Sequence, residues 1–352
     1  MEFIIGLLYV GGVIYLANQD DLRREIGAPM RGDVAASALL PWMLYGLVAI
    51  ASLFAVMILY LAYAPDMAAA MEELGLPPIQ IDRTAAVINL ALAVVLGGLS
   101  AAVINSMRVR VWVQQIVTGF YNPLSSVHTT ALVLALLAVS VFFGQFVQQG
   151  GQAGLVEALR DSNSLVASSV IFDAILRVVI AFLGVGLAIR RTLPQSLARL
   201  GLRLPTRDDI RWGIGGGVAI YVSFLITATI WVALVSPEQF EEQTNAASQI
   251  AQMFNTLPLA LILAVSAAVG EEILFRGALQ PVFGWIPTSI LFALLHIQYT
   301  LTPATLIIFV VSLGLGWVRM RQSTTAAIIA HFLYDFVPLA LQVAAGGSMS
   351  AQ

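Results

Sequence analysis

Long apolar runs alternate with short polar segments along the whole chain. A helix needs about 20 apolar residues to cross the hydrocarbon core of a bilayer, because each helical residue adds only about 1.5 Å. The runs of suitable length are Phe3–Ala17, Ala38–Ala64, Ala85–Asn105, Thr130–Val147, Leu165–Ile189, Ile214–Val235, Leu257–Leu274, Trp285–Tyr299, Ala304–Val318 and Thr324–Leu341. This pattern predicts an all-α protein, a multi-pass transmembrane helical bundle of about ten spans.

The composition agrees with a membrane protein. Of 352 residues, 59% are hydrophobic and 11% are charged, and the mean hydropathy is +0.89, whereas soluble domains carry about 25% charged residues. We predict that the first span is a retained helix and not a signal peptide, because it is preceded by Glu2 and lacks a basic start. Cysteine is absent, which excludes disulfides, thiolate metal sites and a cysteine nucleophile.

All 17 basic residues are arginines, and outside the apolar runs they gather in alternate loops. Cytoplasmic loops collect positive charge, so the loops after the first, third, fifth and ninth spans are assigned to the cytoplasm. Both termini are then outside, in a multi-pass protein of the cell membrane. The expected partners include membrane lipids but not nucleic acid, because no basic cluster is interleaved with aromatic residues.

The most basic loop follows the fifth span and marks the strongest change in composition. Its arginines are Arg190, Arg191, Arg199, Arg203, Arg207 and Arg211. They can contact anionic head groups or serve only to orient the helices. We predict a boundary near Leu200, with N-terminal transmembrane helices of unassigned role in residues 1–199 and a functional core in residues 200–345. Gly213 and Gly217 then stand four apart in an apolar helix, a spacing that suits close packing of transmembrane helices.

Three motifs place ionisable residues inside the last apolar runs. They are Glu271-Glu272-x-x-x-Arg276, Phe292-x-x-x-His296 and His331-x-x-x-Asp335. A charged side chain at mid-bilayer costs about 3 kcal/mol on insertion scales, so such a group is a candidate functional site. The rise of a helix allows the three motifs to lie at one depth.

The spacing within the motifs suggests what each residue does. Residues four apart share a helix face, so we predict that Glu272 pairs with Arg276 and leaves Glu271 as the acid for chemistry. Asp335 follows His331 by one turn and can hold the orientation of its ring through a hydrogen bond. An acid that orients a histidine is a recurring device in catalytic sites.

Together the three motifs resemble the CPBP family of intramembrane proteases, which includes the CAAX prenyl-protein endopeptidases and bacteriocin-immunity proteins. The resemblance covers roughly Leu200 to Leu341. It implies hydrolysis of peptide bonds inside a helical membrane core that opens toward the cytoplasm. Glu271 and His296 would polarise a water, and His331 with its partner would stabilise the oxyanion. The implied substrate is a peptide or a membrane protein, with a lipidated C-terminus as one form.

The same residues leave open a role for a metal. Asp335 stands where many relatives carry Asn, and an ionised Asp cannot donate a hydrogen bond to an oxyanion. It can be protonated, orient His331 or bind a metal. The family is often labelled as metalloproteases, and Glu271, His296, His331 and Asp335 could supply the ligands of a catalytic zinc. The alternative is a glutamate-activated water without a metal.

Two other classes of protein compete with the protease hypothesis. A proton-coupled transporter needs ionisable groups through the full depth of the membrane, but here they concentrate at one level and no inverted repeat is visible. A non-catalytic immunity or scaffold protein would keep the fold without hydrolysis. Asp173 and Arg177, four apart in the fifth span, are predicted to form a structural ion pair, with a charge relay as the alternative.

Overall fold

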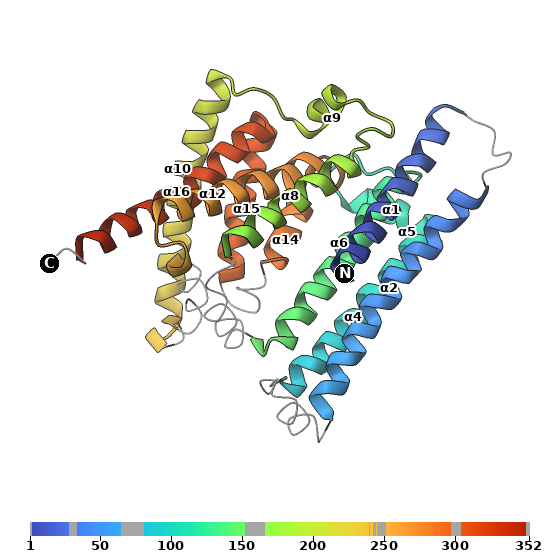
Figure 1. Ribbon diagram of the computed structural model, residues 1–352, viewed down its shortest axis with the longest axis horizontal. Coiled ribbons are helices and arrows are strands. Elements are labelled where there is room, and N and C mark those ends of the chain that lie inside the picture. Colours follow the sequence, from blue (N-terminus) through green and yellow to red (C-terminus); the bar gives the residue numbers. More distant parts are fainter. Residues whose placement is uncertain are drawn as a thin grey trace. The chain divides into compact units, whose positions relative to one another are not determined.

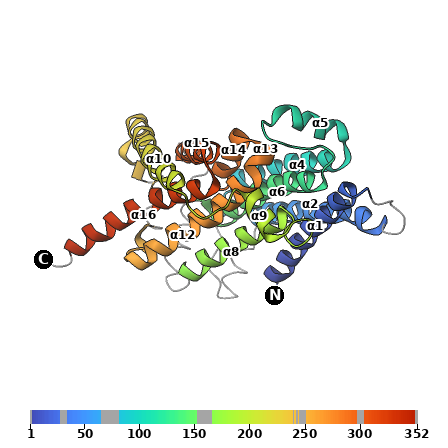
Figure 2. The same cartoon turned by 90° about the horizontal axis from the view of Figure 1, so that it is seen from above.

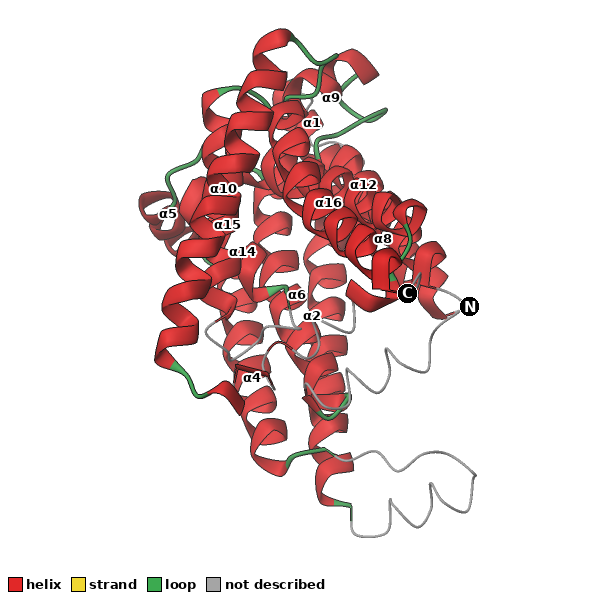
Figure 3. Cartoon of the chain, turned by 90° about the vertical axis from the view of Figure 1, so that its left-hand side faces the viewer, coloured by secondary structure: helices red, strands yellow, loops and turns green. Residues whose placement is uncertain are grey.

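The chain is a helical membrane protein in the computed structural model. The structure describes residues 2–27, 34–64, 81–151, 166–238, 240, 241, 244, 251–296 and 304–349. Figure 3 shows helices joined by loops throughout these residues. Eight helices of the described part are long and apolar enough to cross a membrane. The prediction of an all-α multi-pass bundle is therefore confirmed.

All ten predicted spans fall on helices, but two of these helices are not among the eight. The first is α1 (Glu2–Glu25), whose C-terminal part is rich in charged residues. The second is α14 (Trp285–Leu294), which has 10 residues and so rises only about 15 Å. Arg31 of the loop after the first span, Arg160 of the loop before the fifth span, and the end of the eighth predicted span lie outside the described residues.

The chain divides into two compact units. The first comprises Met1–Ile116, Asn122–Leu159 and Leu294–Thr300, and the second comprises Val117–Tyr121, Arg160–Ala293 and Leu301–Gln352. The structural division thus falls near residue 160, whereas the change in composition lies near Leu200. As a result α8 (Val166–Gly184) belongs to the same unit as the glutamate and His331 motifs.

The first unit contains α1, α2 (Val34–Tyr63), α4 (Arg83–Asn105), α5 (Met107–Ile116) and α6 (Ser126–Gln148). The helices α2 and α4 lie side by side along their length (Figure 1). Small and branched apolar residues from α1, α2, α4 and α6 make one core cluster. The buried carboxylate of Asp21 fastens α1 to the start of α6, since it accepts a hydrogen bond from Ser125 Oγ at 2.5 Å.

The second unit contains the remaining described helices. They are α8, α9 (Leu193–Leu200), α10 (Arg207–Leu234), α12 (Leu257–Glu272), the π-helical segment η1 (Ile273–Leu279), α13 (Gln280–Phe283), α14, α15 (Ala304–Arg321) and α16 (Thr324–Met349). The helix α12 packs against α8 and α16, and α10 packs against α15 and α16 (Figure 2). The helix that carries His331 therefore lies between α10 and the helix that carries the glutamates.

Glycines bring α10 and α16 into close contact, as their spacing predicts. A Cβ atom at Gly213 would lie 2.5 Å from Ile329 Cγ2, and one at Gly217 would lie 3.1 Å from Ala330 O. Both distances are shorter than ordinary van der Waals contact. The absence of a side chain at these positions lets the α10 backbone approach α16 directly before His331.

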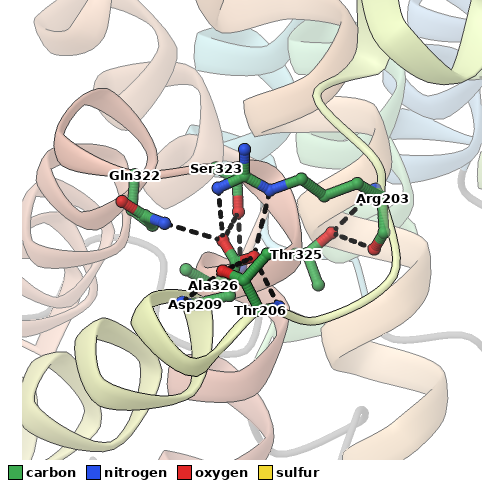
Figure 4. A network of polar contacts seen from close by, with 7 residues as sticks. All are labelled: Arg203, Thr206, Asp209, Gln322, Ser323, Thr325 and Ala326. Carbon is green, nitrogen blue, oxygen red and sulfur yellow. Dashed lines mark hydrogen bonds and ion pairs between the residues drawn. The ribbon is translucent and has the colours of Figure 1, made fainter.

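A buried carboxylate joins the start of α10 to the turn between α15 and α16 (Figure 4). Asp209 accepts hydrogen bonds from Arg203 Nε at 3.0 Å, Gln322 Nε2 at 3.2 Å and Ser323 Oγ at 2.5 Å. It also closes a capping box with Thr206, which satisfies backbone N–H groups at the helix start. The hydrogen bond with Asp209 raises the pKa of Arg203. This network fixes where α16 begins relative to α10.

Candidate active site

A buried chain of charged side chains connects two of the three motifs. Glu272 has no exposed surface, and its two oxygens face different partners. Oε2 lies 3.2 Å from Arg276 Nε, and Oε1 lies 2.9 Å from His331 Nδ1. On the other side of the ring, His331 Nε2 lies 3.3 Å from Asp335 Oδ2. The predicted pairing of Glu272 with Arg276 is present, and the histidine contacts a carboxylate through each nitrogen.

The guanidinium of Arg276 is fully buried and is held from several directions. Its Nη2 donates to the carbonyl oxygen of Ser312 at 3.2 Å and to the Ser312 hydroxyl at 3.1 Å. The ring of Phe292 lies 4.6 Å from the guanidinium carbon, a cation–π distance. The same ring packs edge-on against His331, with centroids 6.4 Å apart. Phe292 thus walls the charged chain on one side.

The backbone changes its hydrogen-bond register directly after Glu272. In η1 the N–H of Gln280 bonds to the carbonyl of Phe275, five residues earlier, where an α-helix would use Arg276 O. Pro281 has no N–H and so cannot bond to Gly277 O. Two arginines donate to these carbonyls instead, with Arg319 Nε 3.3 Å from Arg276 O and Arg199 Nη1 3.1 Å from Gly277 O.

These arginine contacts stabilise a backbone that an α-helix would not adopt. Single π-turns often occur at functional sites, and this one carries the buried guanidinium of Arg276. Arg199 lies in α9, outside the spans, where burial lowers its pKa to about 10, with repulsion from Arg191, Arg319 and Arg190 acting in the same direction. The hydrogen bond of Arg199 to Gly277 O shows that a residue of the basic loop also holds the η1 backbone.

Glu271 contacts α8 through Arg177. Its side chain is 12% exposed, and its Oε1 lies 3.6 Å from Arg177 Nη1. Arg177 also forms the predicted ion pair with Asp173, at 2.6 Å. The two helices meet closely here, since a Cβ atom at Gly270 would lie 2.9 Å from Ala174 Cα. The spacing of Asp173 and Arg177 predicts their ion pair but not the contact of Arg177 with Glu271.

His296 follows the C-terminus of α14 and is half-buried. It belongs to the segment Leu294–Thr300, which groups with the first unit, while Glu271 and His331 belong to the second. The structure therefore brings together Glu272, Arg276, His331 and Asp335. Glu271 directly precedes the first of these residues in the sequence. A shared role for His296 with Glu271 stays a prediction.

The described residues do not complete the ligand set of a catalytic zinc. His331 Nε2 and Asp335 Oδ2, 3.3 Å apart, are close enough for two atoms of one tetrahedral metal. A catalytic zinc takes three protein ligands, and among the described residues no three His, Asp or Glu side chains gather in this way. A metal bound by Glu271, His296, His331 and Asp335 stays a prediction.

One comparison with known proteins matches the part of the chain that holds the motifs. Residues 253–337 match the family model described as type II CAAX prenyl endopeptidase Rce1-like. This segment of the chain is therefore similar to the CAAX endopeptidases. Recognition of this protease family from three motifs is thereby confirmed. No curated protein and no solved structure matches the chain.

The segment that matches the family model begins shortly before α12 and ends just after Asp335. It therefore includes the glutamates, Arg276, Phe292, His296 and His331, but not α8 or α9. Arg177 and Arg199, which contact the segment from those two helices, lie outside the matched residues. Their charge inside or beside apolar runs was a signal in the sequence, but nothing in the sequence indicated which carbonyl or carboxylate they contact.

Proposed function

We propose that this protein is an intramembrane endopeptidase that hydrolyses peptide bonds of membrane-associated substrates, with Glu271 as the general base. The observation that supports the proposal is that the two adjacent glutamates differ in burial and in the residues that they contact. Glu272 is fully buried between Arg276 and His331, so it is committed to holding the site together. Glu271 keeps partial exposure, which a group needs in order to reach water and substrate.

The proposed reaction has two proton transfers. Glu271 takes a proton from a water molecule, and the resulting hydroxide attacks the carbonyl carbon of the scissile peptide bond. The oxygen of that carbonyl becomes negative, and His331 stabilises it by donating from Nε2, which exchanges its 3.3 Å contact with Asp335 for the oxyanion. The C–N bond then breaks as Glu271 returns its proton to the leaving nitrogen, giving an amine and a carboxylic acid, which loses its remaining proton to solvent.

Glu272 supports this role for His331. A histidine donates from both nitrogens only when it is protonated, and in that form Nδ1 donates to Glu272, which fixes the ring's direction. Asp335 then acts as the acceptor that holds the second proton until an oxyanion replaces it. This assignment gives Asp335 an orienting role and does not require it to donate a hydrogen bond.

We further propose that the site opens toward the cytoplasm and that both termini are outside. The distribution of arginines supports this orientation, since the basic loop that holds η1 through Arg199 is assigned to the cytoplasm. The family description supports a prenylated peptide as one substrate. The C-terminal sequence Cys-aliphatic-aliphatic-X is the signal for prenylation of its cysteine, so an enzyme for such substrates would meet them at the cytoplasmic face.

The test compares protein termini in membranes of host cells that express the wild type, Glu271→Ala or Glu238→Ala at equal levels. Glu238 is an exposed glutamate of the same unit and serves as the matched control. We expect termini that are present with the wild type and Glu238→Ala and absent with Glu271→Ala, because loss of a general base lowers a rate by about 10²–10⁴-fold.

A purified assay complements the cellular one. The probe is a quenched peptide that ends in a farnesylated Cys-aliphatic-aliphatic-X sequence, compared with the same peptide without the lipid. Cleavage of the lipidated peptide alone would establish the prenylated substrate class. Termini that are identical for the wild type and Glu271→Ala, together with an uncleaved peptide, would contradict the protease proposal and favour the non-catalytic immunity or scaffold role.

A further inference from the structure

Arg177 of α8 lies between two carboxylates. Its Nη2 is 2.6 Å from Asp173 Oδ2, and its Nη1 is 3.6 Å from Glu271 Oε1. The side chains are partly exposed, at 27% for Arg177, 50% for Asp173 and 12% for Glu271. The planar guanidinium fork presents donors on both sides, so one side chain serves both acids. Asp173 occupies one side of the fork and directs the other side toward Glu271.

The backbone of the two helices is arranged to allow this contact. Gly270, the residue before Glu271, faces Ala174, and a Cβ at Gly270 would approach Ala174 Cα to 2.9 Å. Arg177 lies one turn beyond Ala174 on α8, so it stands beside Glu271 when the small residues touch. The approach of α8 to α12 at Gly270 therefore fixes how far the guanidinium is from the carboxylate.

The location of the pair within an apolar helix calls for an explanation. Asp173 and Arg177 lie in a span of mean hydropathy 1.9, where charged residues are costly and tend to be functional. An ion pair within one helix turn stabilises that helix only weakly. Contact with Glu271 explains why the pair lies in this span, whereas its small contribution to the stability of α8 does not.

We propose that Arg177, oriented by Asp173, is a positioning residue for Glu271, and that α8 is therefore part of the catalytic unit although it lies outside the CAAX-endopeptidase match. The inference rests on the proposed function, because it concerns the base of that reaction. Arg177 holds Glu271 Oε1 in one direction without touching substrate. Loss of that direction slows the chemical step and leaves substrate binding as it was.

The test measures kcat and KM for the farnesylated peptide with full-length protein in nanodiscs. The variants are Arg177→Met, Arg177→Lys and Asp173→Asn. The control is Arg24→Met, which removes the arginine of another pair four residues apart, at 2.9 Å from Asp20 in the first unit. We expect Arg177→Met to lower kcat about 10-fold or more, since misplacement of a catalytic group by about 1 Å can cost 10²-fold.

The other variants separate positioning from structural support. KM should stay within about two-fold of the wild type, and Arg177→Lys should recover part of the lost kcat because it restores the positive charge. Asp173→Asn should lower kcat less than Arg177→Met, since it weakens the orientation of the Arg177 guanidinium but leaves that group in place. Arg24→Met should match the wild type. If Arg177→Met fails to fold, the kcat values of Arg177→Lys and Asp173→Asn decide whether Arg177 positions Glu271.

The outcomes distinguish this inference from the proposed function. Glu271-dependent cleavage with equal kcat for Arg177→Met and Arg24→Met would overturn the positioning role and leave the protease intact. The pair would have only a structural role if Arg177→Met lost thermal stability in parallel with kcat and Arg177→Lys recovered none of the lost kcat. If the wild type cleaved the peptide no faster than Glu271→Ala, the protease proposal would be overturned, and the positioning role with it.

Discussion

Replacing Glu272 with glutamine should destabilise the second unit far more than a typical loss of charge. Glu272 and Arg276 have no exposed surface, so the variant leaves a guanidinium in the protein interior without its carboxylate. Removing one partner of a buried pair costs about 3–5 kcal/mol. Arg276 keeps both Ser312 acceptors and the Phe292 ring, and the new amide can still accept one hydrogen bond. We therefore expect the lower end, about 3 kcal/mol.

The assay is equilibrium unfolding in mixed micelles, with increasing fractions of a denaturing detergent, followed by tryptophan fluorescence. Asp208→Asn is the control, because Asp208 and Arg211 form a pair of similar spacing at 3.5 Å that is 68% and 78% exposed. Surface pairs contribute about 0–1 kcal/mol, so this variant should unfold within about 0.5 kcal/mol of the wild type.

A double variant tests the cause of the loss. Glu272→Gln together with Arg276→Met removes both charges, so no uncompensated ion is left and part of the stability should return. We expect an interaction energy of about 2 kcal/mol, within the range found for residues in one network. Equal losses for Glu272→Gln and Asp208→Asn, or strictly additive losses in the double variant, would refute the view that this carboxylate is the buried counter-charge.

Three further predictions follow from other parts of the structure. Gly213→Ala should lower the free energy of unfolding by about 1–3 kcal/mol through overpacking against α16, whereas Gly215→Ala, with no atom within 4 Å of the added carbon, should be neutral in the same micelle assay. Asp209→Asn should lower the free energy of unfolding by about 1–3 kcal/mol, because hydrogen bonds to a charged group are lost. A stability equal to that of the wild type would contradict the role of the hydrogen bonds to Asp209. Dialysis against a strong zinc chelator should leave peptide cleavage unchanged, because in the proposed reaction Glu271 activates water without a metal; activity lost on chelation and restored by zinc would contradict that reaction and support a metal site.

Contacts within one helix turn could be predicted from the sequence, and contacts between helices could not. The pairs Glu272–Arg276 and Asp173–Arg177 follow from a separation of four residues, because helix geometry alone places such residues on one face. The contact of His331 Nδ1 with Glu272 joins residues 59 positions apart, and a helical period contains no information about which faces of two helices meet. The π-turn was missed for a related reason, since its register depends on donors supplied by Arg199 and Arg319 from other elements.

From the sequence alone follow a helical membrane protein and a resemblance to the CAAX endopeptidases, because length and hydropathy decide which segments can enter a bilayer and three short motifs carry the resemblance. Tertiary structure decided how the two adjacent glutamates differ. Both have the same intrinsic chemistry and lie about 100° apart on one helix. Only the packing of α16 against one face and α8 against another gives Glu272 a buried arginine and histidine and gives Glu271 the guanidinium of Arg177.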